Sequence, residues 1–81
     1  MIGEAEKAKL QVGYKQAVRA LNENNAEKLF IAEDCDDKMK NTLAALANEK
    51  NAPVTYVPTM KELGSICEIE VSASCATLLK N

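Results

Sequence analysis

Short β-rich segments alternate with helix-like segments along this chain, and the alternation constrains its fold more than any other feature of the sequence. Apolar or β-branched residues gather at 10–12, 28–32, 53–57 and 74–79, and between them lie segments with helical periodicity or helix-capping residues. This alternation is typical of an α/β domain with helices on both faces of a small sheet. Eighty-one residues allow only one modest core, so residues 1–81 are expected to form a single domain.

Apolar spacing and capping residues place the first two helices. Tyr14, Val18 and Leu21 recur at i, i+4 and i+7, which predicts an amphipathic helix that stops in the polar turn at 22–25. In the acidic run at 33–37, Asp36 is the expected N-cap of the next helix and Asp37 complements its dipole. The apolar stripe of that helix is expected to be Met39, Leu43, Leu46 and Ala47.

A third helix is predicted after the β-rich segment at 53–57. Thr59 and Glu62 match a capping box, in which a hydroxyl and a carboxylate each accept from the other residue's backbone amide. The apolar residues of this helix are expected to face inward; they are Leu63, Ile66 and Cys67. Residues 4–9 are expected to form a short polar helix, residues 68–72 a loop, and residues 74–79 a closing strand or a mixture of strand and helix.

Charge and hydropathy exclude several classes of protein. Ten basic residues oppose twelve acidic ones, and the net charge is −2. A binder of nucleic acid or membrane without sequence preference needs a broad basic face, which this balance argues against, although a small basic patch remains open. The longest apolar run, at 43–47, is far shorter than the ~20 residues that span a membrane, and the first residues lack the features of a signal peptide. A cytoplasmic protein without membrane contact is expected.

The inventory of reactive side chains argues against metal or catalytic chemistry. The chain has three cysteines, Cys35, Cys67 and Cys75, and no histidine, so a four-ligand zinc site and the usual acid–base catalyst are both excluded. The acidic run at 33–37 lacks the alternating ligands of a calcium loop, and helix capping explains it. We expect free thiols, no metal, no cofactor and no catalytic residue; a small enzyme is the weakest of the functions considered.

The segment at 13–16 departs from the usual chemistry of a helix start. The first turn of a helix favours acids, yet here Gly13 precedes Lys15 and Gln16, and the turn contains no acid. Free amides, an ammonium group and a carboxamide could receive a phosphate and a base edge. Alternatively, Gly13 is only a permissive turn and both polar side chains face solvent. The residues by themselves leave these two interpretations open.

A set of short motifs, in order, resembles a known family. They are residues 13–16 at a helix start, Lys28 before a strand, residues 32–34 at its end, residues 63–64 in a capped helix, and residues 69–71 before small residues. From about residue 5 to residue 80 the chain is similar to the L7Ae/L30e family of ribosomal and RNP proteins, which bind kink-turn RNA, and most of all to its short bacterial members.

The resemblance implies a three-layer α/β/α sandwich around a four-stranded mixed sheet, with kink-turn RNA, ribosomal or regulatory, as partner and the ribosome as a candidate assembly. It implies an RNA-binding edge in which Gly13, Lys15 and Gln16, with Tyr14 between them, meet tandem sheared G·A pairs. Lys28 is then expected to touch phosphate, and Glu33 or Asp34 to accept from a base. An extruded nucleotide is expected to pack on Ile69, Glu70 and Val71. The alternative is a protein–protein interaction module on the same fold.

Overall fold

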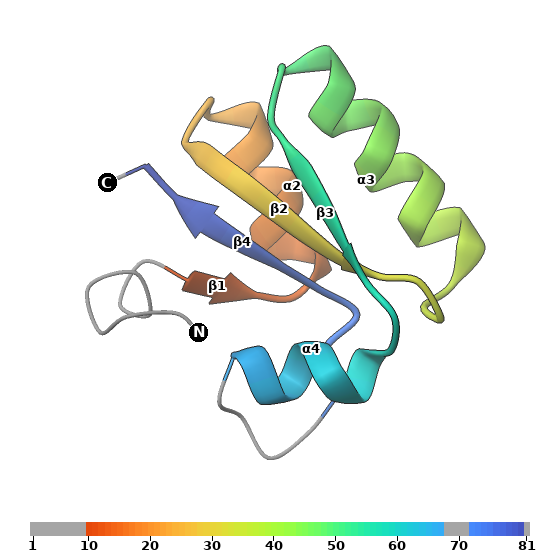
Figure 1. The fold of residues 1–81 in the computed structure, drawn as a ribbon. Helices are drawn as coiled ribbons and strands as arrows, with labels where there is room; N and C mark the ends of the chain where they lie inside the picture. The colour runs from red at the N-terminus through yellow and green to blue at the C-terminus, as the bar shows by residue number, and fades with distance from the viewer. Residues whose placement is uncertain (1–9, 68–71, 81) are drawn as a thin grey trace.

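The computed structural model describes residues 10–67 and 72–80, and strands alternate with helices throughout these ranges (Figure 1). The elements in chain order are β1 (Leu10–Val12), α2 (Tyr14–Asn22), β2 (Ala26–Ala32), α3 (Asp37–Glu49), β3 (Val54–Val57), α4 (Met60–Ile66) and β4 (Cys75–Leu79). Every strand and helix predicted within these ranges is present, although β2 begins two residues before the predicted segment. The predicted helix at 4–9 lies outside the described residues. None of the helices in the described ranges is long and apolar enough to cross a membrane.

The four strands form one mixed sheet in the order β1-β4-β2-β3. The last strand, β4, enters the middle of the sheet and runs antiparallel to both β1 and β2, whereas β2 and β3 are parallel. A parallel pair needs a long crossover, and α3 provides it between β2 and β3. The last strand is thereby held in the centre of the sheet, and the first strand, β1, forms one edge beside it.

Helices lie on both faces of the sheet, as predicted (Figure 1). Because side chains alternate along a strand, Leu29 and Ile31 share one face of β2, and the residues paired with them on β4, Thr77 and Cys75, share that face. All four are fully buried where α2 and α3 pack side by side. The shorter α4 covers part of the other face, and the fold is the three-layer α/β/α sandwich expected from the sequence.

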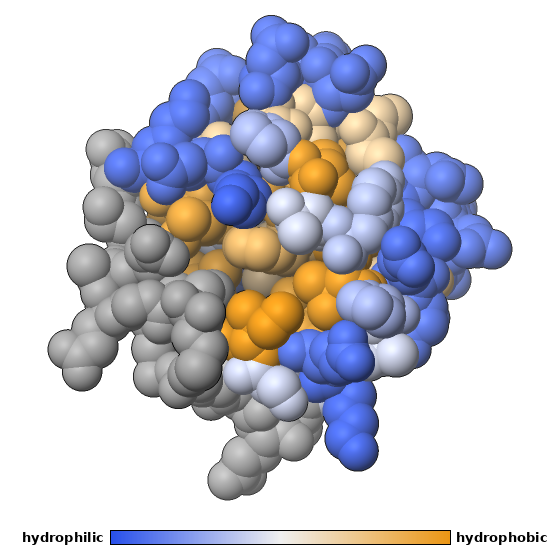
Figure 2. Space-filling view, in the orientation of Figure 1, coloured by the Kyte–Doolittle hydropathy of each residue, from blue (hydrophilic) through white to orange (hydrophobic). Residues whose placement is uncertain are grey.

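The face that α4 covers is less completely shielded by the described residues. Phe30 is half-buried there and Lys28 is exposed, although Ala32 and Ala76 are fully buried. Figure 2, which views the molecule from this side, shows apolar residues in the middle of the face, with hydrophilic ones at the top and on the right. The compact core therefore lies chiefly between the sheet and the pair α2 and α3.

Most of the predicted apolar stripe residues reach the core, but one does not. Leu21, Leu43 and Leu63 are fully buried, and Cys67 is 6% exposed. The prediction for Ile66 is wrong, because its side chain is 38% exposed. On a helix with 100° per residue, the buried positions of α4 (63, 64 and 67) form one stripe, and position 66 falls roughly 110° from its centre.

Polar side chains fix the starts of α3 and α4. The Asp36 carboxylate accepts from the backbone amides of Lys38 at 2.8 Å and Met39 at 3.2 Å, as predicted. Thr59 Oγ1 accepts from the Glu62 amide at 3.1 Å, which is the hydroxyl half of the predicted capping box. Both helix starts are therefore stabilised by their own sequence.

Candidate nucleic-acid interface

Gly13 holds a backbone conformation that other residues rarely adopt. Its φ is 119° and its ψ is 157°, in a region that is essentially restricted to glycine. The Gly13 amide donates to the carbonyl of Cys75 at 3.1 Å and so fixes the start of α2 against β4. A Cβ built on Gly13 would meet no atom within 4 Å, so the space in front of this residue is open. The glycine is required by its backbone, and it also leaves room for another molecule to approach.

The first turn of α2 presents donors and no acid. Gly13 provides no side-chain cap, and the first turn contains no acidic residue. Lys15 and Gln16 are exposed, while the helix buries Ala17, Ala20 and Leu21 against the core. The backbone amides of a first turn have no partner within the helix, so this end combines open amides with an ammonium group and a carboxamide. Such an end can receive an anion and hydrogen-bond to a base edge.

Tyr14 packs against the core and lies beside the start of α3. Its side chain is half-buried, and together with the first two turns of α3 it encloses a shallow hollow of about 260 Å³. The other residues around this hollow are Asp36, Lys38, Met39 and Thr42. Tyr14 is therefore mainly a spacer between the two helix starts, with one side open to solvent.

Three chain segments meet beside the start of α2. Two of these segments donate hydrogen bonds to the start of β4. The Gly13 amide donates to the Cys75 carbonyl, and the Ala32 amide donates to the Ser74 carbonyl at 2.9 Å. The amide of Glu33 donates to the carbonyl of Val57 at 2.8 Å, at the end of β3. The structure thus brings the helix start at 13–16 and the acids that follow β2 to one edge of the sheet.

The two predicted acids at this edge differ in their contacts. Asp34 Oδ1 accepts from the backbone amide of Met60 at 2.8 Å, so this carboxylate tethers the start of α4 to the end of β2. The Glu33 side chain is exposed, and its carbonyl accepts from Lys40 Nζ at 3.0 Å. Of the two alternatives, Glu33 has the freer carboxylate. Ile69, Glu70 and Val71 lie outside the described residues.

Lys28 is not brought to this edge. Lys28 pairs with Leu78 on β4, whereas Gly13 is bonded to Cys75. Leu78 and Cys75 are three residues apart, which is roughly 10 Å along the strand. The Lys28 side chain lies on the sheet face opposite to α2, with Nζ 5.8 Å from the centroid of the Phe30 ring. A contact between Lys28 and phosphate stays a prediction, and it belongs to a different part of the surface.

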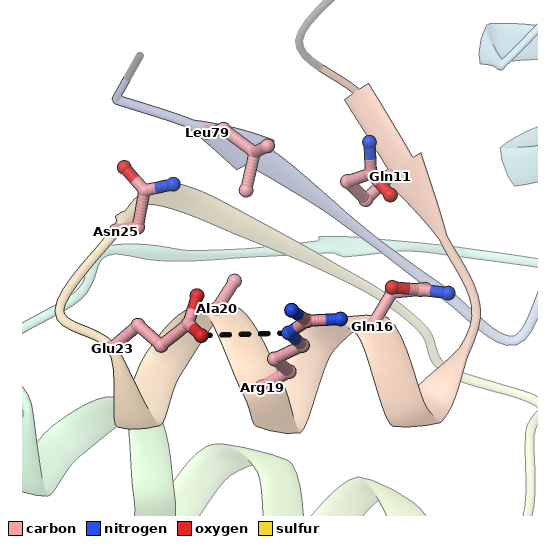
Figure 3. Close-up of a pocket in the computed structure, with 7 residues that line it drawn as sticks. All are labelled: Gln11, Gln16, Arg19, Ala20, Glu23, Asn25 and Leu79. Atoms are coloured by element: carbon pink, nitrogen blue, oxygen red, sulfur yellow. Dashed lines mark hydrogen bonds and ion pairs between the residues drawn. The ribbon is translucent and has the colours of Figure 1, made fainter.

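Arg19 is a candidate that the sequence analysis missed. It is exposed on α2, three residues after Gln16 and four after Lys15, so the three side chains follow one another along the same flank. Arg19 Nε donates to Glu23 Oε2 at 3.4 Å, which orients the guanidinium beside a hollow that Gln16 also lines (Figure 3). The i+3 and i+4 spacing from Lys15 and Gln16 is the signal that could have identified it.

The three cysteines are free and buried beneath this edge. Burial raises the pKa of the Cys35, Cys67 and Cys75 thiols above the ordinary value, because a thiolate loses its hydration inside the protein. Since the thiolate is the reactive form, these side chains are poor nucleophiles. They act as small apolar residues of the core.

Comparisons with known proteins agree with this fold. The model of the ribosomal protein L7Ae/L30e/S12e/Gadd45 family matches residues 3–81. RNA-binding protein YbxF of Geobacillus stearothermophilus is 43% identical over 72 residues, which cover 89% of this chain and 88% of that protein. RNA-binding protein BH0128 of Halalkalibacterium halodurans is 37% identical over 71 residues, which cover 88% of this chain and 87% of that protein.

Solved structures share the fold at lower identity. The Giardia lamblia 15.5kD RNA binding protein superposes with a TM-score of 0.79 at 24% identity, over 91% of this chain and 62% of that one. A protein of unknown function from Bacillus halodurans gives a TM-score of 0.82 at 19% identity, over 91% of this chain and 74% of that one. With a family model that matches almost the entire chain and relatives above 40% identity, the chain belongs to the ribosomal protein L7Ae/L30e/S12e/Gadd45 family.

Proposed function

We propose that this protein is a non-catalytic RNA-binding protein of the cytoplasm that recognises kink-turn RNA, ribosomal or regulatory, and stabilises its kinked form. The observation that carries the proposal is the start of α2, where Gly13 provides no side-chain cap and Lys15 and Gln16 are exposed. A sharp kink brings phosphates together, so a protein that fills the bend with donors favours the bent state over the open one.

Each residue of the helix start has a role in this proposal. Gly13 leaves space for the RNA backbone to approach, as the open region in front of it allows. Lys15 and the first-turn amides bind phosphate, and Gln16 bonds to a base edge of the G·A pairs, because a carboxamide both donates and accepts. Tyr14 positions the pair from the α3 side.

The neighbouring segments extend the proposed contact. Glu33 is exposed at the same edge and accepts from a base, whereas Asp34 is chiefly engaged with the Met60 amide. Residues 69–71 are assigned to an extruded nucleotide on the family resemblance alone. Lys28 is assigned to phosphate on the same basis. Relatives that match nearly 90% of this chain are named RNA-binding proteins, which supports RNA as the partner.

The test is a titration of the protein with a kink-turn RNA and with a control RNA whose G·A pairs are replaced by Watson–Crick pairs. We expect strong preference for the kink-turn RNA. Lys15→Ala and Gln16→Ala should each weaken binding by about 1–3 kcal/mol without lowering thermal stability. Lys50→Ala, which removes a lysine at the far end of α3, is the matched control and should bind like the unchanged protein.

Equal affinity for the two RNAs would contradict kink-turn recognition. Unchanged affinity in both variants, with unchanged stability, would remove the helix start from the interface. In that case the protein–protein interaction module becomes the leading interpretation.

A further inference from the structure

A polar hollow of about 230 Å³ lies beside α2, on the flank that continues from the helix start (Figure 3). It is lined by Gln11, Gln16, Arg19, Ala20, Glu23, Asn25 and Leu79. These residues come from β1, from α2, from the turn before β2 and from β4. The hollow is therefore built by the fold and does not depend on one flexible loop.

The strand register explains why the hollow exists. Gln11 pairs with Thr77, so its side chain shares the sheet face on which Thr77 is fully buried beneath α2. Leu79 lies two residues further along β4, on the same face. Gln11 and Leu79 occupy the outer part of this face, where α2 covers the sheet only partly, and they form the floor beside the helix.

Apart from the Glu23 carboxylate, which is paired with Arg19, the lining is suited to a ligand that carries hydroxyl groups and negative charge. Gln11, Gln16 and Asn25 contribute three carboxamides, each of which donates and accepts. Arg19 adds a guanidinium that Glu23 contacts through Nε alone, so its terminal NH₂ groups are not used in that pair. A ribose 2′-hydroxyl donates and accepts, and a phosphodiester accepts with charge, so a ribose–phosphate chain matches this set.

The hollow is also continuous with the proposed interface. Gln16 belongs both to the helix start and to the hollow, and Arg19 lies one turn further along. From Gln16 to Glu23 the helix advances roughly 10 Å, which is long enough to follow an RNA strand beyond the nucleotides at the helix start. An RNA strand that continues from residues 13–16 along this flank meets the hollow at Gln16 and Arg19.

We infer that this hollow binds the ribose–phosphate backbone of the stem that leaves the kink, with Arg19 on phosphate and with Gln11 and Asn25 on 2′-hydroxyl groups. The inference rests on the proposed function and deepens it, because it names a second contact with the same RNA. It gives the protein a means to distinguish RNA from DNA at a position away from the G·A pairs.

The experiment titrates the unchanged protein and a Gln11→Ala/Asn25→Ala double variant with four nucleic-acid molecules. The first is a kink-turn RNA, and the second and third are the same RNA with 2′-deoxy nucleotides in one stem or in the other. The fourth is the Watson–Crick control. Asn48→Ala, which removes an exposed carboxamide on α3, is the matched control. Thermal melts of each variant establish that it is folded.

For the unchanged protein, 2′-deoxy substitution of one stem should lower affinity by about threefold to tenfold. The double variant should show a similar loss on the all-ribose RNA, little further loss on the deoxy-stem RNA, and intact preference over the Watson–Crick control. Asn48→Ala should behave like the unchanged protein.

Two results overturn the inference and separate it from the proposed function. If kink-turn preference is intact but neither the deoxy stem nor the double variant changes affinity, the hollow is not a contact and the proposed function stands. If the unchanged protein shows no preference for kink-turn RNA, the proposed function fails and the inference fails with it.

Discussion

The starts of α2 and α3 lie close together and are built in opposite ways. At the start of α3 the Asp36 carboxylate accepts from the amides of Lys38 and Met39, and Asp37 adds a second negative charge to the first turn. At the start of α2, Gly13 has no side chain to accept with, and the first turn contains Lys15 where an acid is favoured. One helix start is satisfied by its own residues, and the other is left open.

The difference shows which helix start can serve a partner. An N-cap side chain stabilises a helix by about 0.5–2 kcal/mol, and α2 forgoes that contribution. Its amides keep their capacity for an external anion, and the open space in front of Gly13 gives an anion access to them. Two variants that exchange the properties of these starts, and one that alters the glycine, test this contrast.

Gly13→Ala should have the largest effect. A φ of 119° is strained for any residue with a Cβ, so the free energy of unfolding should fall by about 1–3 kcal/mol. The added methyl group also narrows the approach to the helix start, so affinity for kink-turn RNA should fall about tenfold or more. Calorimetry of the free variant and titration with labelled RNA measure the two effects.

The control for backbone strain is Asn51→Ala, at the end of α3, where φ is 58°. It should lower stability in the same direction and leave RNA affinity unchanged. If both variants lose RNA affinity, the loss in Gly13→Ala is due to lower stability and not to a blocked contact.

Lys15→Glu should separate stability from binding. An acid in the first turn complements the helix dipole, so the protein should gain about 0.3–1 kcal/mol of stability. The same change places a negative charge against phosphate, so RNA affinity should fall by about tenfold or more. Thermal melts and RNA titration of one preparation measure stability and RNA affinity. If stability and affinity rise together or fall together, the contrast between the helix starts is contradicted.

Asp36→Ala should give the converse result at α3. The amides of Lys38 and Met39 lose their acceptor, and stability should fall by about 0.5–2 kcal/mol. RNA affinity, measured at a temperature where the variant is folded, should stay within about twofold, a change of less than 0.5 kcal/mol. A large loss of RNA binding would show that α3 also contacts the RNA.

The dependence of affinity on salt should be small. With few cations near the proposed interface and a net charge of −2, log affinity should fall against log salt with a slope of roughly −2 to −4. Lys15→Ala should make the slope shallower by about one unit, whereas Lys38→Ala should not. A slope near −8 would indicate a broad electrostatic surface instead.

The local part of the fold could be predicted from the sequence because its causes are local. The apolar stripes of α2 and α3, the Asp36 cap and the short strand before Gly13 each depend on residues within a few positions of one another. The apolar side chain of Ile66 favours a buried position, but its angular position on a short helix places it at the surface. Length and periodicity over seven residues were too little to orient that helix.

The parts of the site that could not be predicted depend on the pairing of distant segments. Asp34 contacts the Met60 amide across 26 residues, so its structural role becomes visible only in the folded chain. Lys28 is separated from Gly13 by the register of β4 against β2, which the motif order does not reveal. Arg19 lies beyond the four-residue motif at 13–16, although helical spacing continues the same flank to it.

The most direct test of the contrast is an amide chemical-shift titration of the protein with kink-turn RNA. We predict large shifts at the amides of Tyr14, Lys15 and Gln16, and small shifts at the amides of Lys38 and Met39, which are bonded to Asp36. The Watson–Crick control RNA should leave both sets nearly unchanged. Larger shifts at the start of α3 than at the start of α2 would contradict the claim that the open helix start binds the RNA.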